Sequence, residues 1–162
     1  MTTRLFDAYI DRVLSHEGGY VHHPKDPGGE TQWGISKRSY PALNIRTLTR
    51  AQAVEIYHRD FWQRAQCDTL PKAVAFQMLD AAVNHGMGNP IRWLQRAARV
   101  VDDGAIGPVT LAALRKLDEN DVLLRFNAER LEFYSALTTF HSFGRGWTRR
   151  VAANLRFAAQ DN

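Results

Sequence analysis

The chain has 162 residues, of which 44% are apolar and 23% are charged, and its formal net charge is +4. This length and composition predict one globular domain with a real core and exclude a disordered or fibrous chain. A single cysteine, Cys67, excludes an internal disulfide and fits synthesis in a reducing compartment. The positive charge favours an anionic partner, but it does not distinguish bacterial wall, lipopolysaccharide and nucleic acid.

The N-terminal segment has the pattern of an amphipathic helix. Phe6, Ile10, Val13 and Glu17 follow one another at spacings of four, three and four, so they share one helical face. Charged residues interrupt the apolar stripe, which argues against a secretory signal peptide, and no stretch approaches the roughly 18 apolar residues of a membrane span. If the target lies outside the cytoplasm, we therefore expect another component to release the protein.

A turn-rich segment follows this helix. Gly18 and Gly19 end the helix, and the sequence from Val21 to Ile35 is rich in Pro, Gly and polar residues. Two short strands are expected, around Val21 and at 32–35. The segment of about residues 18–45 is therefore predicted to form a small β-hairpin or loop lobe.

From about residue 49 onward every segment predicts a helix. Thr49 and Gln52 form a capping box, Pro71 and Gly86 bound the next helix, and Gly107-Pro108 starts another. The remaining starts are predicted at Asn89-Pro90, at Asn120 or Asp121, and after Gly146. The predicted fold class is mainly α, as one domain over 1–162 with a helical lobe over about 49–162.

Two carboxylic acids in the opening stretch have contrasting surroundings. Glu17 continues the apolar helix face near the helix C-terminus, where desolvation and the helix dipole both raise a carboxyl pKa. Asp26 lies in "KDPGGE", a turn with free backbone donors that favour the ionised form. Glycosidic cleavage uses such a pair, in which one acid donates a proton while the other supports the cationic sugar or activates water. Thr31 offers a hydroxyl that could hold that water.

These residues also have an ordinary explanation. A glutamate near a helix C-terminus is commonly a surface residue, and an aspartate before Pro-Gly-Gly is commonly a turn former. Spacing alone leaves both readings open.

The stretches "EGGY" and "DPGGETQWGIS" resemble those of the phage endolysin muramidases of glycoside hydrolase family 108. "FQMLDAAVNHG", "DGAIGPVTLAAL" and "RLEFYSALTTFHSFGRGWTRR" extend the resemblance over nearly the whole chain. It implies a lysozyme-like fold, an N-acetylmuramidase with Glu17 as catalytic acid, and no metal or organic cofactor. The order Glu17, Asp26, Thr31 also resembles the active site of the phage lysozymes, in which the threonine comes one residue later.

The family has a peptidoglycan-binding region after the motif "DGxxGPxT". Here the motif residues are Asp103, Gly104, Gly107, Pro108 and Thr110. Individually, these residues are explained by a tight loop that leads into a helix whose first position is proline.

Four further residues are candidate substrate contacts. Tyr20 and Trp33 belong to the turn-rich lobe and could stack on sugar rings. Asp80 and Asn84 are one helical turn apart, and they could either face a sugar cleft or hydrogen-bond to a neighbouring helix.

Three other functions remain as alternatives. A zinc amidase is suggested by the six histidines and one cysteine, and His16-Glu17 begins the zinc-protease motif. Tyr20 occupies the second histidine position of that motif, however, and adjacent side chains such as His22 and His23 rarely converge on one metal. A lytic transglycosylase could use Glu17 alone, and a non-catalytic protein could bind murein without cleaving it. Nucleic-acid binding lacks a helix-turn-helix or single-strand signature.

The C-terminal segment combines cationic and apolar residues. Arg149, Arg150 and Arg156 occur there with Val151, Leu155 and Phe157, which predicts either a solvated helix face or electrostatic contact with an anionic outer membrane. The family resemblance further implies a monomeric phage lysis enzyme that is made in the bacterial host cytoplasm and lyses bacterial walls after passing through holin-type pores.

Overall fold

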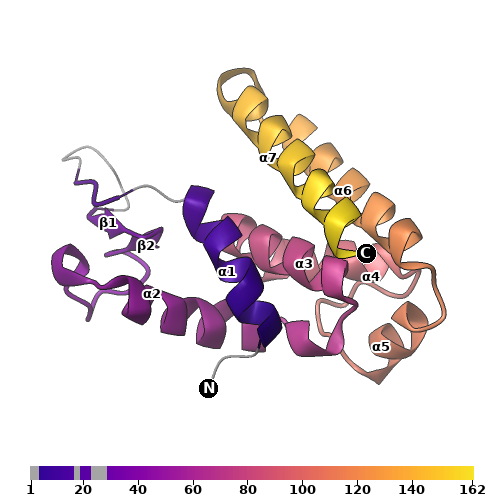
Figure 1. Cartoon of the computed structure of the whole chain (residues 1–162). Coiled ribbons are helices and arrows are strands. Elements are labelled where there is room, and N and C mark those ends of the chain that lie inside the picture. The colour runs from indigo at the N-terminus through magenta and orange to yellow at the C-terminus, as the bar shows by residue number, and fades with distance from the viewer. Residues whose placement is uncertain (1–3, 17–18, 23–28) are drawn as a thin grey trace. The chain divides into compact units, whose positions relative to one another are not determined.

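The computed structural model describes residues 4–16, 19–22 and 29–162, and it divides the chain into two compact units, Met1–Trp62 and Gln63–Asn162. Within the described residues the chain is mainly helical, with one two-stranded antiparallel sheet near the N-terminus (Figure 1). This confirms the predicted fold class. The predicted lobe boundary at about 45–49 lies inside the first unit.

In the first unit, helix α1 (Arg4–His16) buries the face that the sequence predicts. Phe6, Ile10 and Val13 are each at most 3% exposed. Trp62 belongs to the π-helix η2 (His58–Gln63). The Phe6 ring lies edge-on to the Trp62 ring, with the ring centroids 5.5 Å apart. Aromatic pairs in this geometry add to the burial energy of their surfaces. The apolar face of α1 is therefore fixed against η2.

The β lobe is a tight hairpin. Strands β1 (Thr31–Gln32) and β2 (Ile35–Ser36) pair antiparallel. Trp33 and Gly34 form the two-residue loop, with φ of 53° and 76°, as a type I′ turn requires. The stretch 32–35, predicted as one strand, is thus a strand end, a turn and a strand start. The other predicted strand, around Val21, is only a single bridge between Val21 and Thr31.

Helix α2 (Arg50–Tyr57) begins at the predicted capping box. The Thr49 side chain accepts from the Gln52 backbone, and the Gln52 side chain accepts from the Thr49 backbone. The short 3₁₀-helix η1 (Ile45–Thr47) precedes α2, and η2 continues it. The sequence predicts residues 50–65 as one α-helix, and the change to π geometry after Tyr57 is not visible in its pattern.

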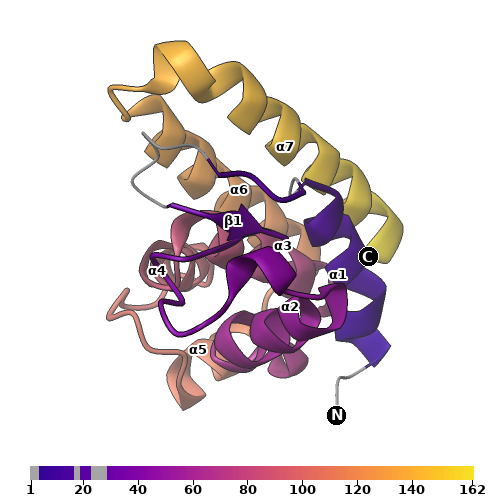
Figure 2. The same cartoon turned by 90° about the vertical axis from the view of Figure 1, so that its left-hand side faces the viewer.

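The second unit is a helical bundle around α3 (Lys72–His85), whose residues 73–82 are all buried. Helix α3 packs against α4 (Gly88–Ala97), α6 (Glu119–Ser135) and α7 (Phe140–Asp161). Helices α6 and α7 lie side by side and antiparallel (Figures 1 and 2). The unit also contains η3 (Cys67–Thr69) and α5 (Pro108–Leu114). In the described part of the chain, no helix is both long and apolar enough to cross a membrane.

Three predicted helix starts are wrong by one residue to seven. Helix α4 starts at Gly88, before Asn89-Pro90, and α6 starts at Glu119 because Asp118 accepts from the backbone of Asn120 and Asp121. Helix α7 starts at Phe140 and runs through Gly144 and Gly146. At Gly144 an added Cβ would lie 2.7 Å from the Phe140 ring, so this glycine serves close packing rather than a helix break.

One buried carboxylate connects three helices of the bundle. Asp80 on α3 has no exposed surface and forms ion pairs with Arg130 on α6 (2.8 Å) and Arg150 on α7 (2.9 Å). It also accepts from the amide of Asn154 at 2.6 Å. Burial alone would raise the pKa of Asp80, but the two guanidinium groups outweigh it and lower this pKa.

These contacts decide two predictions. Of the two roles left open for Asp80, hydrogen bonding to neighbouring helices is the one observed. Because Asp80 has no exposed surface, the prediction that it contacts a sugar is wrong. Arg150 belongs to the same ion-pair cluster, with its side chain 14% exposed. It therefore does not belong to the predicted cationic surface, nor does the buried Val151.

We predict that Asp80→Asn strongly destabilises the fold, because it leaves the fully buried Arg130 without its counter-charge. Breaking a buried ion pair typically costs about 3–5 kcal/mol. Urea unfolding measures the loss. The matched control is Asp121→Asn, which breaks the exposed pair with Arg125 and should cost less than about 1 kcal/mol. Equal losses in both variants would contradict the importance of the buried cluster.

Candidate functional site

The candidate catalytic acids Glu17 and Asp26 lie outside the described residues. The described structure positions the chain on either side of them. Helix α1 ends at His16, and the segment after Glu17 returns at residues 19–22 to pair with β1. The described part of the site therefore consists of the residues that flank Glu17 and Asp26 in the sequence and of the other predicted contacts.

Thr31 has a fixed backbone position on β1. Its N–H donates to the Val21 carbonyl at 2.9 Å, and its carbonyl accepts from the Val21 N–H at 2.8 Å. Thr31 is half-buried. Its predicted role in holding water stays a prediction.

Glu30, which sequence reasoning missed, is held beside Thr31. The Tyr20 hydroxyl donates to Glu30 Oε1 at 2.9 Å, and this hydrogen bond is the main reason why the pKa of Tyr20 is raised. The bond adds to the Val21–Thr31 bridge in holding residues 19–22 beside β1. The signal that could have indicated Glu30 was its position directly before the candidate residue Thr31. Tyr20 remains a predicted sugar contact, since its ring is exposed.

Trp33 has an unusual backbone conformation, with a positive φ of 53°. A left-handed φ in a bulky residue costs about 1–3 kcal/mol and persists only where the surroundings impose it. Here the Trp33 carbonyl accepts from the Tyr57 hydroxyl at 2.9 Å. Its buried indole Nε1 has no hydrogen-bond partner among the described residues. The predicted role of Trp33 in sugar stacking stays a prediction.

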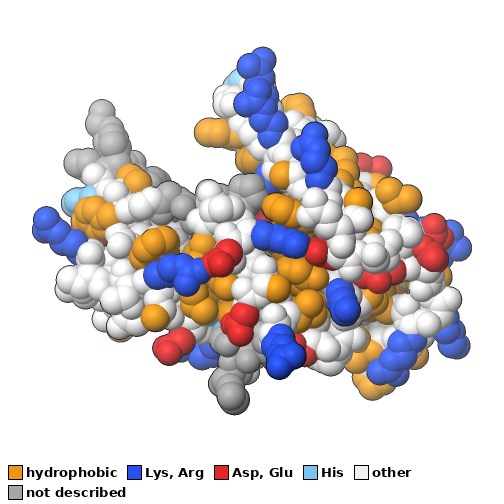
Figure 3. Space-filling view, viewed as in Figure 1, with side chains coloured by type: hydrophobic (Ala, Val, Ile, Leu, Met, Phe, Trp, Pro, Cys, Tyr) orange, Lys and Arg blue, Asp and Glu red, His pale blue; other side chains and the backbone are white. Residues whose placement is uncertain are grey.

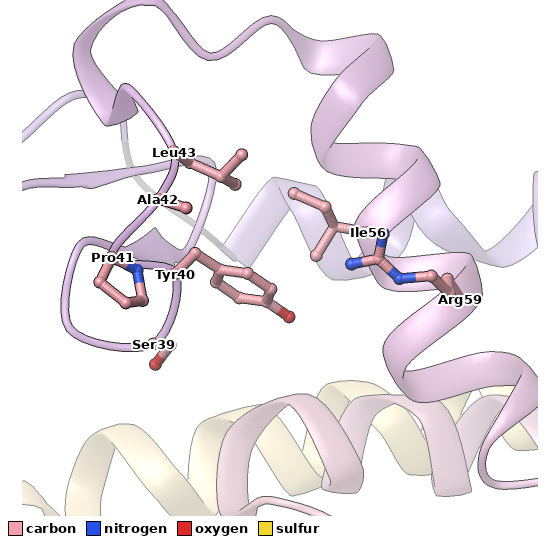
Figure 4. A pocket seen from close by; sticks show the side chains of 7 residues that line it. All are labelled: Ser39, Tyr40, Pro41, Ala42, Leu43, Ile56 and Arg59. Carbon is pink, nitrogen blue, oxygen red and sulfur yellow. The ribbon is translucent and has the colours of Figure 1, made fainter.

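The first unit contains a separate cavity of about 280 Å³ between the loop 39–43 and α2–η2 (Figure 4). On this side Tyr40 donates to Asp60 at 2.8 Å, and Arg59 forms an ion pair with the same carboxylate at 2.7 Å. None of the predicted site residues that the structure describes lines this cavity.

In the second unit, a hydrogen-bond network orients Asn84 at the end of α3. The Tyr134 hydroxyl donates its single hydrogen to Asn84 Oδ1 at 2.9 Å and accepts from Arg130 Nε at 3.3 Å. His85 Nε2 lies 3.0 Å from the same hydroxyl, so His85 must donate from Nε2. Asn84 is an exposed residue, and because its Oδ1 is occupied, Nδ2 is the end that remains for a ligand. The predicted contact of Asn84 with substrate stays a prediction.

Two family models match consecutive parts of the chain: "Glycosyl hydrolase 108" over residues 10–86 and "Predicted Peptidoglycan domain" over 89–152. The solved structure of Brucella abortus SagA is similar over 96% of this chain and 94% of that chain, with 36% identity and a TM-score of 0.88. The chain belongs to the glycosyl hydrolase 108 family. No curated protein matches it.

As a member of glycosyl hydrolase 108, the protein is a glycoside hydrolase that acts on peptidoglycan. The first matched region contains every residue that the sequence predicts for catalysis or substrate contact. Among the described residues, no group of three His, Cys, Asp or Glu side chains could hold a metal ion.

The "DGxxGPxT" motif of this glycosyl hydrolase 108 chain forms the predicted tight loop. Gly104 has a φ of 83°, Gly107 is the N-cap of α5, and Pro108 is its first residue. Thr110 is 2% exposed and accepts from the buried Gln95 at 3.3 Å. These residues shape the loop, and the Thr110 side chain faces the interior.

We predict that the stability of the fold falls between about pH 7 and about pH 5, and that His85→Gln reduces this fall. Burial, with the nearby Arg130, lowers the pKa of His85 from 6.5 to about 4. The unfolded chain therefore takes up a proton at His85 that the folded chain refuses, so stability declines as the pH falls through this window. Urea unfolding at the two pH values measures the effect. An unchanged pH slope in His85→Gln would contradict it.

Proposed function

We propose that the enzyme cleaves the β-1,4 bond between N-acetylmuramic acid and N-acetylglucosamine in peptidoglycan, and thereby lyses bacterial walls. The observation that carries this proposal is the glycosyl hydrolase 108 match over 10–86, which contains the Glu-Gly-Gly segment directly after α1. Such a bond breaks when an acid protonates the leaving oxygen and the sugar cation is stabilised.

We assign the acid to Glu17. It is the next residue after α1 in the sequence, and it continues the spacing of Phe6, Ile10 and Val13, which are all buried. Asp26 stabilises the developing oxocarbenium charge or orients the attacking water. Thr31, held on β1 by its backbone bonds to Val21, supports that water.

We predict that Glu17→Gln lowers the rate of wall cleavage by roughly 10²–10⁴, because glutamine keeps the size of glutamate but has no proton to transfer. The measurement is the release of soluble products from purified sacculi, with the fold checked by urea unfolding. Near-normal cleavage by the folded variant would refute the assignment.

The variants Asp26→Asn and Thr31→Ala test whether these two residues take part in the cleavage. A strong loss in Asp26→Asn and a smaller loss in Thr31→Ala are expected of a hydrolase that uses both residues. A lytic transglycosylase needs one acid alone and leaves anhydro-sugar ends. Full activity in Asp26→Ala, together with products lighter by one water in mass spectrometry, would favour the transglycosylase.

We also propose that α7 holds the enzyme on anionic envelope surfaces. From Phe140 to Gln160 the sequence has no acidic residue, and Arg145, Arg149 and Arg156 are exposed. Basic side chains are visible at the upper end of the α6–α7 pair, beside hydrophobic ones (Figure 3). Phe140 and Phe143 of this helix are 38% and 57% exposed.

We predict that replacing Arg145, Arg149 and Arg156 with glutamine weakens envelope binding at low salt and leaves turnover of soluble muropeptide chains nearly unchanged. Attraction between exposed charges weakens as the screening length falls from about 10 Å at 0.1 M salt to about 3 Å at 1 M. Sedimentation with envelopes at both salt concentrations measures it. The control replaces Arg38, Arg64 and Arg115, which are exposed outside α7. Equal binding losses in both triple variants would show that net charge alone matters.

Phage origin and passage through holin-type pores rest on the sequence resemblance and stay predictions. Lysis of cells that express the enzyme together with a holin, and survival of cells that express either one alone, would test the delivery route.

A further inference from the structure

The loop between α4 and α5 encloses a groove in the second unit. The groove has a volume of about 430 Å³, and all its lining residues fall between Gln95 and Thr110. They therefore lie within the region 89–152 that matches the peptidoglycan family model. The match does not say which part of peptidoglycan is bound, or where.

The loop is held in one shape by a buried glutamine. Gln95 is 1% exposed, and its Oε1 accepts from the Gly104 N–H at 2.8 Å. Its Nε2 donates to Asp103 Oδ1 at 2.7 Å and to the Ala105 carbonyl at 3.0 Å. A loop fixed in this way loses little conformational freedom when a ligand binds, which favours binding.

One part of the groove lining is apolar and unusually exposed. Val101 is 81% exposed and Val109 is 72% exposed, and Val100 and Ala105 line the groove with them. Among the residues that the structure describes, no aromatic side chain lines the groove. Sugar rings are commonly bound by aromatic rings, so this lining suits small aliphatic groups better than a glycan.

Asp103 adds a negative charge to this lining. Gln95 and the Ala105 N–H both donate to Oδ1, and together they lower the pKa of Asp103, so it is ionised at neutral pH. The neighbouring Asp102 is paired with Arg96. The charge of Arg92 also lowers the pKa of Asp103, but no described cation forms an ion pair with Asp103. The second oxygen of this exposed carboxylate thus remains for a cationic ligand.

We propose that this groove binds the peptide stem of peptidoglycan, with the free amine of an un-cross-linked diamino acid on Asp103 and alanine methyl groups over Val101 and Val109. This inference rests on the proposed function, because it takes the peptidoglycan wall as the substrate. It distinguishes the peptide from the glycan as the group recognised in the second unit. Cross-linking acylates the amine, so the groove prefers stems that are not cross-linked.

The test titrates the full chain with a soluble stem peptide that ends in lysine or diaminopimelate, and follows backbone amide signals by NMR. Signals of residues 100–110 should shift, and the free-amine peptide should bind roughly fivefold tighter than its Nε-acetylated form, as for an exposed ion pair. Asp103→Asn should remove this preference while keeping the Oδ1 acceptor for Gln95. The charge-matched control Glu132→Gln, exposed on α6, should retain the preference.

A second variant tests the apolar part of the groove. Val109→Ser should weaken binding of both peptides, because the side chain is exposed and its loss does not disturb a core. Equal affinities of the two peptides for the wild type, shifts confined to other residues, or a preference retained in Asp103→Asn would each overturn the proposal. The peptides contain no glycosidic bond, so this result is independent of whether the enzyme cleaves glycan as proposed.

Discussion

The buried charge of Asp80 is the constraint on which the second unit depends. A carboxylate without exposed surface is tolerated only where cations and hydrogen-bond donors replace its lost water. Arg130, Arg150 and Asn154 supply that replacement from α6 and α7. Arg130 comes from α6, while Arg150 and Asn154 come from α7, so one requirement fixes both helices against α3.

The same requirement extends to the surface at the end of α3. Arg130 can only donate hydrogen bonds, so the Tyr134 hydroxyl accepts from it and must donate its own hydrogen to Asn84. The neutral state of His85 agrees with this order, because a charged imidazole beside Arg130 would be unfavourable. An exposed amide is thus oriented by a chain of contacts that starts at a buried carboxylate.

The family regions and the compact units divide the chain at different places. The glycosyl hydrolase 108 match continues past the boundary at Trp62 and includes all of α3, while the peptidoglycan match begins at residue 89. Helix α3 is nevertheless the centre of the bundle that contains α4, α6 and α7. The region 89–152 therefore shares its packing with a helix of the preceding region. The two matched regions consequently meet within the second unit, where α3 of the first packs against α4, α6 and α7.

The sequence by itself determined the elements whose signals are local. The apolar spacing of Phe6, Ile10 and Val13, the capping box at Thr49 and the Gly107-Pro108 start are each set by neighbours within a few residues, and the structure confirms them. The family resemblance likewise depended on short stretches of sequence. Only the tertiary structure decided which polar residues are buried and paired. Asp80 and Arg150 are 70 residues apart, so no local pattern could show that one neutralises the other. Glu30 gained its place beside Tyr20, and Gly144 its place inside a helix, from contacts that exist only after the chain has folded.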